Sequence, residues 1–544
     1  MALAAQAGQV EQKAPISSEE KLVIVASSVG TVFEWYDFYL YATLAPFFAA
    51  LFFPKGNATA ALLSAFAAYA AGFLVRPFGA LFFGRIGDLI GRKYTFLVTI
   101  VVMGLSTFLV GLLPTFEAIG WFAPVILVSL RLLQGLALGG EYGGAATYVA
   151  EHSGPDRRGY NTSWIQTTAT VGFFLALVVI GLCRSTMQST VFSTWGWRIP
   201  FWVSIVLLAF SVYIRLKLQE SPVFKKIKSE GKTSKAPLTD SFLRYPNNKY
   251  ALLALLGATA GQGVVWYTGQ FYALFFMQIT LRLDYLTTYM LIAASLVIGT
   301  PFFIFFGWLS DKIGRLKIIL AGCLIAAVTY FPLFKGLTHY VNPALEEFQA
   351  RTPISVTVDQ ATCHFHLFVG PWSKFSDCDK TRDFLTKQGL SFASLPGPAG
   401  SAPLVKIGAT EIQGWNEKGI AETLKAQGYP TGGADKSRVN YAMTLLLLVI
   451  MVLYVTMVYG PIAAFLVELF PTRIRYTSMS LPYHIGNGWF GGMLPLTATA
   501  IVALKGDIYY GLWYPIVVSV MTVVIGGIFL RETKGRDITT YEHA

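Results

Sequence analysis

Charged side chains are scarce in this sequence. Only 13% of its 544 residues are Asp, Glu, Lys or Arg, and 54% are hydrophobic, whereas about 25% of the residues of a soluble domain are charged. The charges are clustered, which leaves long apolar runs such as 97–113 and 441–458. A helix needs roughly 20 apolar residues to cross a bilayer. The scarcity of charge therefore argues against a soluble protein and predicts one embedded in the lipid bilayer.

Motifs for catalysis and ATP hydrolysis are also missing. The sequence contains no GxxxxGK[ST] loop, so ATP-driven work by this chain is not expected. No catalytic constellation stands out, so we expect neither an enzyme nor a cofactor. Cysteine is rare, with 4 residues. His364 and His366 lie close to Cys363, but this short cluster is not expected to bind a metal.

Twelve apolar segments are long enough to cross a membrane. Lys and Arg gather in alternate connections, for example at Arg92–Lys93, Lys225–Lys228 and Arg531–Arg536, and are rare in the others. Because cytoplasmic loops are rich in Lys and Arg, both termini are predicted to be cytoplasmic. The net charge of +12 then reflects topology and lipid contact, and nucleic acid is not an expected partner. The segments are 21–50, 60–83, 94–113, 120–150, 160–183, 197–216, 249–279, 286–309, 317–335, 441–468, 476–503 and 510–530.

Two local patterns occur twice along the chain. Gly84-x-x-x-Asp88-x-x-Gly91-Arg92 recurs as Gly307-x-x-x-Asp311-x-x-Gly314-Arg315. Tyr142-Gly143, followed by Glu151 and Arg158, recurs with the same spacing as Tyr459-Gly460, followed by Glu468 and Arg475. Repeated halves are a common build for membrane carriers. The predicted fold is therefore all-α, with twelve transmembrane helices in two six-helix pseudo-repeats.

The second half carries an insertion. The interval from Arg315 to Tyr459 is much longer than the matching interval from Arg92 to Tyr142, and the polar stretch 336–440 accounts for the difference. The helix count places this stretch outside the cytoplasm, where Cys363 and Cys378 can form a disulfide; two free thiols are the alternative. Alternating residues at 355–358 and 364–368 predict a small α+β module.

These features divide the chain into seven parts. They are an N-terminal tail (1–20), a first bundle (21–217), a cytoplasmic linker (218–248), helices seven to nine (249–335), the insertion (336–440), helices ten to twelve (441–530) and a C-terminal tail (531–544).

The repeated loops predict a gate at the cytoplasmic side. Glycines let helix ends approach closely, and an acid there can bind a helix N-terminus or an arginine. Charges so placed can hold one conformation closed and release it in another; the alternative is a tight turn whose arginines only set topology. The predicted gate residues are Gly84, Asp88, Gly91, Arg92, Glu151, Arg158, Asp311, Arg315, Glu468 and Arg475.

Several motifs together resemble a known family. The Gly-x-x-x-Asp-x-x-Gly-Arg-Lys loop is typical of the major facilitator superfamily. Further motifs are similar to its metabolite:H⁺ symporter family, which is related to sugar porters, and the resemblance covers about 20–540 except the insertion. They are Glu34-Trp-Tyr-Asp37-Phe, Arg131-Leu-Leu-Gln134-Gly, Gln219-Glu-Ser-Pro-Val-Phe224, Glu468-Leu-Phe-Pro-Thr-Arg473 and Glu532-Thr-Lys-Gly-Arg536.

The resemblance implies a function and a place. It implies alternating-access symport of protons with a small metabolite, such as a dicarboxylate, an oxo acid, betaine or proline, in a bacterial inner membrane. Arg131 favours a substrate with a carboxylate. A facilitative uniporter on the same fold and a receptor that uses 336–440 are the alternatives. The oligomeric state stays open, and a monomer is compatible with the sequence.

Ionisable residues inside spans are candidates for proton coupling, because burying a charge in a bilayer is costly. They are Glu34, Asp37, Arg131 and Glu141. In proton-coupled sugar porters an aspartate of helix one faces an arginine of helix four, and Asp37 and Arg131 match those positions. The alternative is a buried pair that only fixes packing. When the two halves are aligned by their repeat, Asp37, Arg131 and Glu141 correspond to Ala260, Leu448 and Val458. The fold itself therefore does not require these charges.

Polar residues in spans four, seven and eleven are candidates for substrate binding, although packing is an equally good explanation for the aromatic ones. They are Arg131, Gln134, Gln262, Tyr267, Gln270, His484 and Asn487.

Overall fold

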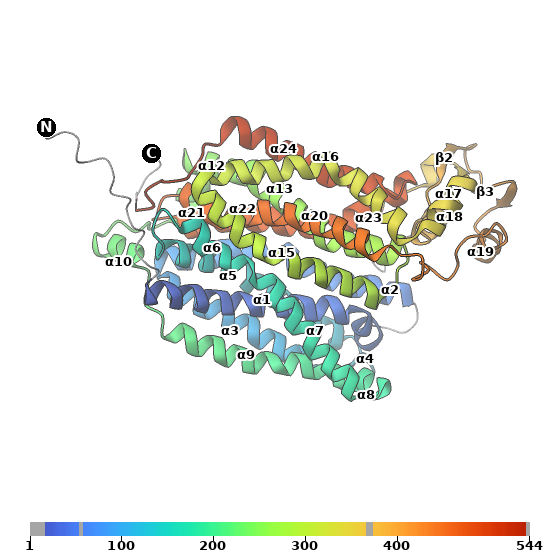
Figure 1. Ribbon diagram of the computed structural model, residues 1–544. Helices are drawn as coiled ribbons and strands as arrows, with labels where there is room; N and C mark the ends of the chain where they lie inside the picture. Colours follow the sequence, from blue (N-terminus) through green and yellow to red (C-terminus); the bar gives the residue numbers. More distant parts are fainter. Residues whose placement is uncertain (1–16, 54–57, 366–373, 540–544) are drawn as a thin grey trace.

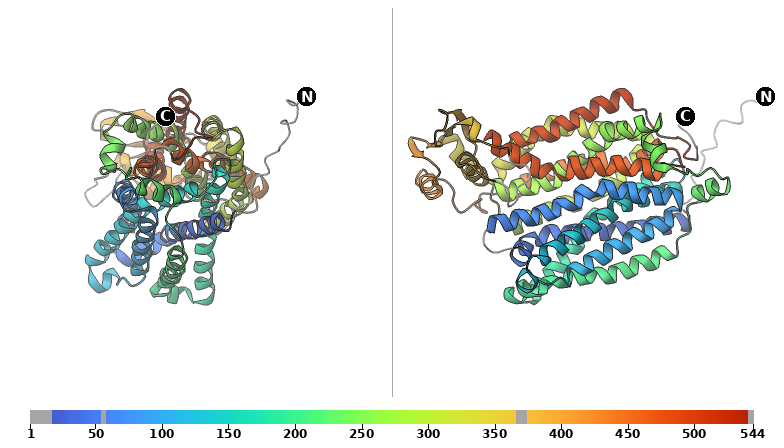
Figure 2. Two further views of the ribbon diagram at one scale, coloured as in Figure 1. Left: turned by 90° about the vertical axis from the view of Figure 1, so that its left-hand side faces the viewer. Right: turned by 180° about the vertical axis from the view of Figure 1, so that it is seen from behind.

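The structure is a computed structural model that describes residues 17–53, 58–365 and 374–539. Long helices run along one common direction and form two halves, one from the first part of the chain and one from the second (Figure 1). The views from the end and from behind show the same division (Figure 2). The arrangement confirms the predicted all-α fold of two related bundles.

The first half contains six spans. Its apolar segments become helices that start and end within a few residues of the predicted limits. They are α1 (Ser18–Phe52), α2 (Ala58–Leu89), α3 (Arg92–Val110), α5 (Phe122–Glu151), α6 with α7 (Arg158–Gln166 and Thr168–Thr186) and α9 (Ile199–Leu216). The short helices α4 (Phe116–Ile119) and α8 (Ser189–Thr194) lie in connections, and α10 (Pro222–Ser229) and α11 (Pro237–Phe242) form the linker.

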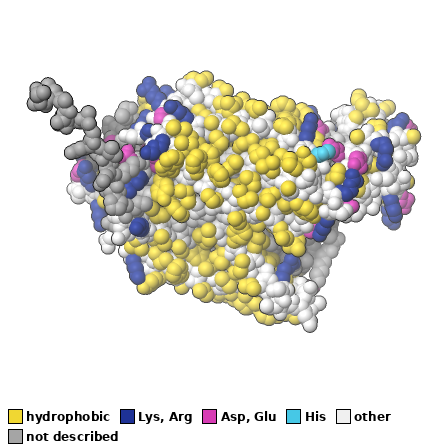
Figure 3. Space-filling model, in the orientation of Figure 1, with side chains coloured by type: hydrophobic (Ala, Val, Ile, Leu, Met, Phe, Trp, Pro, Cys, Tyr) yellow, Lys and Arg dark blue, Asp and Glu magenta, His cyan; other side chains and the backbone are white. Residues whose placement is uncertain are grey.

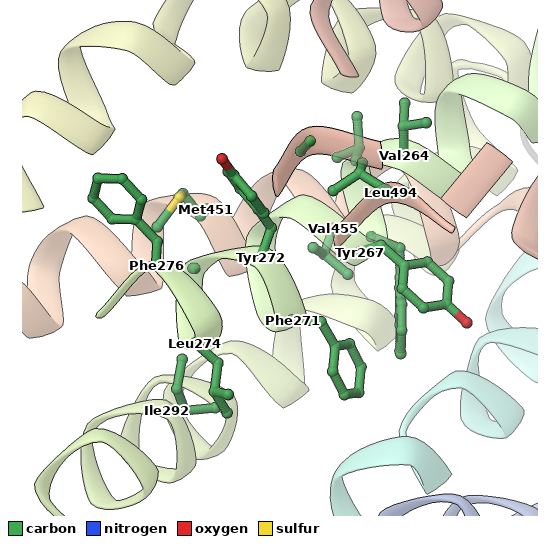
Figure 4. Packing of buried hydrophobic residues seen from close by; sticks show 14 of the residues in the cluster. Val264, Tyr267, Phe271, Tyr272, Leu274, Phe276, Ile292, Met451, Val455 and Leu494 are labelled. Carbon is green, nitrogen blue, oxygen red and sulfur yellow. The ribbon is translucent and has the colours of Figure 1, made fainter. Parts of the chain in front are cut away.

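The second half contains the other six. Its first span runs over Asn247–Thr280 and includes three π-helical segments, η2 (Leu255–Thr259), η3 (Thr268–Tyr272) and η4 (Phe276–Thr280), beside α12 (Asn247–Ala254), α13 (Ala260–Tyr267) and α14 (Ala273–Phe275). Tyr272 of this span lies in the same apolar cluster as Met451 and Val455, which belong to the helix Tyr441–Tyr459 (Figure 4). The others are α15 (Tyr285–Ile313), α16 (Arg315–Val341), α20 with α21 (Tyr441–Tyr459 and Ile462–Leu469), α22 with η6 and α23 (Arg475–His484, Ile485–Gly492 and Leu494–Lys505) and α24 (Trp513–Phe529).

The outer surface of the bundle matches a membrane environment. In the described residues, 10 helices are long and apolar enough to cross a bilayer, and α1 and α2, of 35 and 32 residues, complete the twelve. On the face that Figure 3 shows, apolar side chains cover the broad middle of the bundle, whereas charged side chains gather toward its two ends. Such a surface is stable only against lipid.

The two ends of the bundle differ. The described chain begins and ends at one end, near α10, and the insertion projects from the opposite end (Figures 1 and 2). We call these the terminal end (the α2–α3 and α15–α16 connections, with α10) and the insertion end (residues 342–440).

The insertion folds as a small α/β module. Its sheet has the order β2-β1-β3-β4, with β1 (Ile354–Val358) parallel to β2 (Ala393–Pro396) and antiparallel to β3 (Leu404–Ile407), and β4 (Thr410–Gln413) antiparallel to β3. The side chains of β1 alternate between buried and half-buried, as expected for a strand with one face on a core. Three helices accompany the sheet: α17 (Pro343–Arg351), α18 (Asp377–Lys387) and α19 (Glu417–Ala426).

Two sequence-based limits of the insertion need correction. Helix α16 continues to Val341, so the module begins near Asn342 rather than at 336; Leu337 and Val341 stay fully buried, which extends the helix. The predicted strand at 364–368 does not form at His364 and Phe365, and the rest of that stretch, including His366, lies outside the described residues. Among the described residues no group of three possible metal ligands occurs.

The module is docked on the second half. Asn342 donates to the Leu281 carbonyl at 2.8 Å, and the Phe392 amide donates to the Gly506 carbonyl at 2.6 Å. Arg282 donates to the Tyr429 hydroxyl at 2.9 Å. These contacts join the module to the ends of the seventh and eleventh spans.

A disulfide links Cys363 to Cys378 across 15 residues, with the Cα atoms 5.3 Å apart. A disulfide that closes a loop of this size stabilises the folded state by about 3 kcal/mol, because it lowers the entropy of the unfolded chain. We therefore expect Cys363→Ser with Cys378→Ser to lower the free energy of unfolding of the module by about that amount. Limited proteolysis of the purified protein will show faster cleavage within 343–440, and dithiothreitol will have the same effect on the wild type. Equal cleavage rates in the variant and the oxidised wild type would contradict this expectation.

Candidate functional site

A buried polar chain links the first, third and fourth spans. Arg131 donates to the Gln134 side-chain oxygen, and the Gln134 amide nitrogen donates to Asp37 at 3.0 Å. Thr107 also donates to Asp37. The residues predicted to couple protons, Asp37 and Arg131, are thus joined through Gln134. The Arg131 guanidinium also stacks on Tyr41, 4.0 Å from the ring centre.

The second oxygen of Asp37, Oδ1, has no hydrogen bond from the described residues. A cavity of about 10 Å³ lies beside Asp37 and Thr107, close to the smallest space that holds one water. A carboxylate with one satisfied oxygen and one open oxygen has a place for a proton. The geometry therefore suits a carboxyl group that gains and loses a proton.

Glu141 forms a separate pair. It binds Arg215 of α9, and its other oxygen accepts from Thr99 at 2.7 Å. Although Glu141 and Arg131 lie on the same helix, the ion pair of Glu141 with Arg215 is separate and lies between α3, α5 and α9. Both charges are satisfied within the first half, which assigns Glu141 a role in packing there.

The predicted polar residues of spans seven and eleven divide into three groups. Gln262 and Asn487 hydrogen-bond to each other through both amide groups, at 3.0 and 2.8 Å. Gln270 lines a cavity of about 40 Å³. Tyr267 and His484 are buried where the two halves meet, and neither ring nitrogen of His484 has a hydrogen-bond partner in the described residues.

The terminal end is closed by aspartates that cap helices of the opposite half. Asp88, at the end of α2, accepts from the Thr477 amide at 2.9 Å and the Tyr476 amide at 3.3 Å. Asp311, its repeat partner, accepts from the amides of Gly159 and Tyr160 at 2.9 and 2.8 Å. An acid at a helix N-terminus is stabilised by the free amides and the helix dipole. The aspartate of each repeated loop therefore binds the N-terminus of a helix in the other half.

Two glutamates extend this closure. Glu468 binds Arg158 of the other half at 2.8 Å and Arg315 of its own half at 3.1 Å. Glu151 binds Arg475 of the other half at 2.8 Å, and Arg92 lies 3.8 Å away. The predicted gate residues thus form two symmetric charge clusters across the interface of the halves.

Glycines make this close approach possible. A Cβ at Gly84 would lie 2.9 Å from the Thr477 Cα, and one at Gly159 would lie 2.5 Å from the Gly307 carbonyl. Gly91 has a φ of 148° at the start of α3, a conformation that L side chains rarely adopt. The glycines of the repeated loop are therefore required by the helix contacts and the turn.

Three charged residues of this arrangement were not among the predicted site residues, although two of them, Glu220 and Glu532, belong to the family motifs given above. Arg215 is the partner of Glu141. Glu220 accepts from the Arg92 amide at 3.2 Å, and Glu532 accepts from the Arg315 amide at 2.7 Å, so each caps the helix that follows a repeated loop. Glu220 and Glu532 could have been predicted as a pair, because they occupy matching positions after the sixth and twelfth spans.

Two six-helix halves, an ionic contact between them at one end and buried charges within the spans are features of a membrane transporter built from repeated halves. The comparisons with known proteins agree. The "Major Facilitator Superfamily" model matches residues 27–338, and the "Sugar (and other) transporter" model matches 425–544. The chain belongs to the Major Facilitator Superfamily.

Curated relatives are transporters of metabolites. The shikimate transporter of Escherichia coli (strain K12) is 34% identical over 326 residues, 59% of this chain and 73% of that protein. The alpha-ketoglutarate permease of the same strain is 35% identical over 59% of this chain and 72% of that protein. The inner membrane metabolite transport protein YhjE is 44% identical, but the match covers 42% of this chain and only 52% of that protein.

Solved structures confirm the fold. The proton:xylose symporter XylE bound to 6-bromo-6-deoxy-D-glucose has a TM-score of 0.61, with 16% identity over 97% of this chain and 99% of that chain. A crystal structure of D-xylose-proton symporter has a TM-score of 0.57, with 15% identity over 95% of this chain and 100% of that chain.

Proposed function

We propose that the protein is a proton-coupled symporter that carries a small organic metabolite with a carboxylate across a bacterial inner membrane. The terminal end faces the cytoplasm, and the insertion module lies on the other side. The observation that carries the proposal is the buried chain Arg131–Gln134–Asp37, because it holds a carboxyl group with an open oxygen inside the spans.

Proton coupling requires that protonation changes the contacts of a mobile element. When Asp37 is ionised, it accepts from Gln134 and Thr107 and attracts Arg131. When it is protonated, this attraction is lost, and Gln134 and Arg131 can rearrange. Because these groups belong to the first, third and fourth spans, the proton can alter how the spans of the first half pack.

Alternating access requires gates that open in turn. The charge clusters at Glu151 and Glu468 close the terminal end in the conformation described here, which therefore corresponds to a state with a closed cytoplasmic gate. The names of the relatives support the substrate class, because they include a shikimate transporter, an alpha-ketoglutarate permease and a putative proline/betaine transporter of Staphylococcus aureus. Each of these substrates carries a carboxylate.

Proteoliposomes test the function. We expect uptake of at least one of labelled shikimate, 2-oxoglutarate, proline and glycine betaine by the purified protein. One proton per substrate allows about tenfold accumulation for each unit of pH gradient, acidic outside, since 1.36 kcal/mol corresponds to tenfold. A protonophore will abolish the accumulation. Uptake that equilibrates without accumulating under the gradient would identify the second candidate, a uniporter with a structural Asp37.

A further inference from the structure

Two buried charged side chains of the first half have neither a side-chain hydrogen bond nor an ion pair with the residues that the structure describes. Arg76 of α2 is 8% exposed, and Glu34 of α1 is 7% exposed. Within the described part of the chain, neither forms an ion pair within 4.0 Å, although they are close enough to interact electrostatically. An unpaired buried charge costs several kcal/mol in a membrane protein, so both charges require an explanation.

Arg76 lies where the halves meet. Its guanidinium lies over the Phe73 ring, 4.4 Å from the centre, and that ring contacts Tyr267 of the second half with centroids 6.0 Å apart. His484 of the second half is within electrostatic range of Arg76. Guanidinium groups bind carboxylates through two parallel hydrogen bonds, and no acid of the described residues makes such bonds to Arg76. This position suits a carboxylate brought by a ligand.

Glu34 lies in a part of the bundle that is rich in aromatic side chains. It is within electrostatic range of Tyr142, Tyr459 and Tyr483. Tyr142 stacks on Tyr483 with centroids 3.7 Å apart, and Trp35, the neighbour of Glu34, contacts Trp266 at 5.0 Å. Aromatic rings around an anion attract organic cations through their negative faces. This position suits a positively charged nitrogen.

We propose that Arg76 and Glu34 form the two poles of the substrate site, and that the substrate is a small zwitterion with its carboxylate at Arg76 and its cationic nitrogen at Glu34. The inference rests on the proposed transport function and refines its substrate class. It assigns the carboxylate to Arg76 rather than Arg131, because Arg131 is already held by Gln134 and Tyr41. A dicarboxylate would place its second charge against Glu34, and like charges repel at this range.

Glycine betaine and 3,3-dimethylbutanoate are a matched pair for the test, because they differ only in a quaternary nitrogen that is replaced by carbon. Binding to the purified protein is measured by calorimetry, and uptake is measured in proteoliposomes with succinate and proline as further probes. We expect the wild type to prefer betaine or proline over the carbon isostere by about 30-fold or more, the usual effect of a lost buried charge contact.

The variants separate the two poles. Arg76→Gln will weaken binding of betaine and of its isostere alike, and Arg76→Lys will restore part of it. Glu34→Gln will weaken betaine binding and leave the isostere unchanged, so the preference disappears. Asp383→Asn, which removes an acid of α18 that is 46% exposed, will keep the preference. Thermal unfolding checks that each variant is folded.

Three results would overturn the proposal: equal wild-type binding of betaine and its isostere, an unchanged preference in Glu34→Gln, and no binding of either zwitterion. Gradient-driven uptake of succinate or 2-oxoglutarate without zwitterion uptake would also overturn it and would leave the symport function intact. Absence of uptake for every probe would instead count against the transport function itself.

Discussion

Asp37→Asn abolishes accumulation under a pH gradient and leaves exchange of substrate across the membrane intact. The variant keeps the shape of the side chain, and its amide oxygen can accept the hydrogen bonds of Gln134 and Thr107. It cannot take up and release a proton. We therefore expect the accumulation ratio to fall from about tenfold for each pH unit to about one, while counterflow of labelled against unlabelled substrate continues.

Asp383→Asn is the matched control, because this aspartate is 46% exposed on α18 and forms only a surface pair with Lys387 at 2.7 Å. Its accumulation ratio will equal that of the wild type. If Asp37→Asn accumulates substrate as well as Asp383→Asn does, Asp37 does not carry the coupled proton. If exchange is lost along with accumulation, the side chain is required for the movement of the halves rather than for proton coupling.

Much of the fold follows from the sequence, because a bilayer imposes strong constraints. Span length and apolar composition located the helices to within a few residues, and the repeat located the insertion. The end of α16 was missed because its last turns pack against the module and continue the helix beyond the apolar run. The docking of the module through Arg282 and Asn342 depends on contacts between distant segments, which have no local signal.

The charged residues that meet at the terminal end could be predicted because the same motif occurs in each half. The partners within each cluster could not be predicted. Glu151 and Glu468 each precede two arginines of their own half by five to seven residues, yet each binds an arginine of the opposite half. Arg76 was not among the predicted site residues, because the sequence does not reveal which arginines find partners after folding. The buried unpaired groups become visible only in three dimensions.

Glu468→Gln opens the terminal end. Glu468 is the acid that binds Arg158 across the interface, and it also binds Arg315 at 3.1 Å. Removing one partner of a buried ion pair costs about 3–5 kcal/mol, because the other charge stays buried without compensation. When the halves separate at this end, Arg158 regains water. The variant therefore shifts the equilibrium toward the open state by a factor of about 10²–10⁴.

Cysteine labelling measures this shift. Ser163 is fully buried at the contact between α6 and α15, so Ser163→Cys reacts with a maleimide only when that contact opens; Cys183 and Cys323, which are free and buried, are replaced by alanine. In inside-out vesicles, we expect labelling of Glu468→Gln to be at least about tenfold faster than that of the parent, since exchange between states limits the observed factor. Glu532→Gln is the matched control, because Glu532 caps α16 within one half through the amides of Arg315 and Leu316 at 2.7 and 3.1 Å. Equal labelling rates for the two variants would mean that the aspartate caps and the Glu151–Arg475 pair hold the gate without Glu468, and that Glu468 adds stability without deciding which end of the transporter is open.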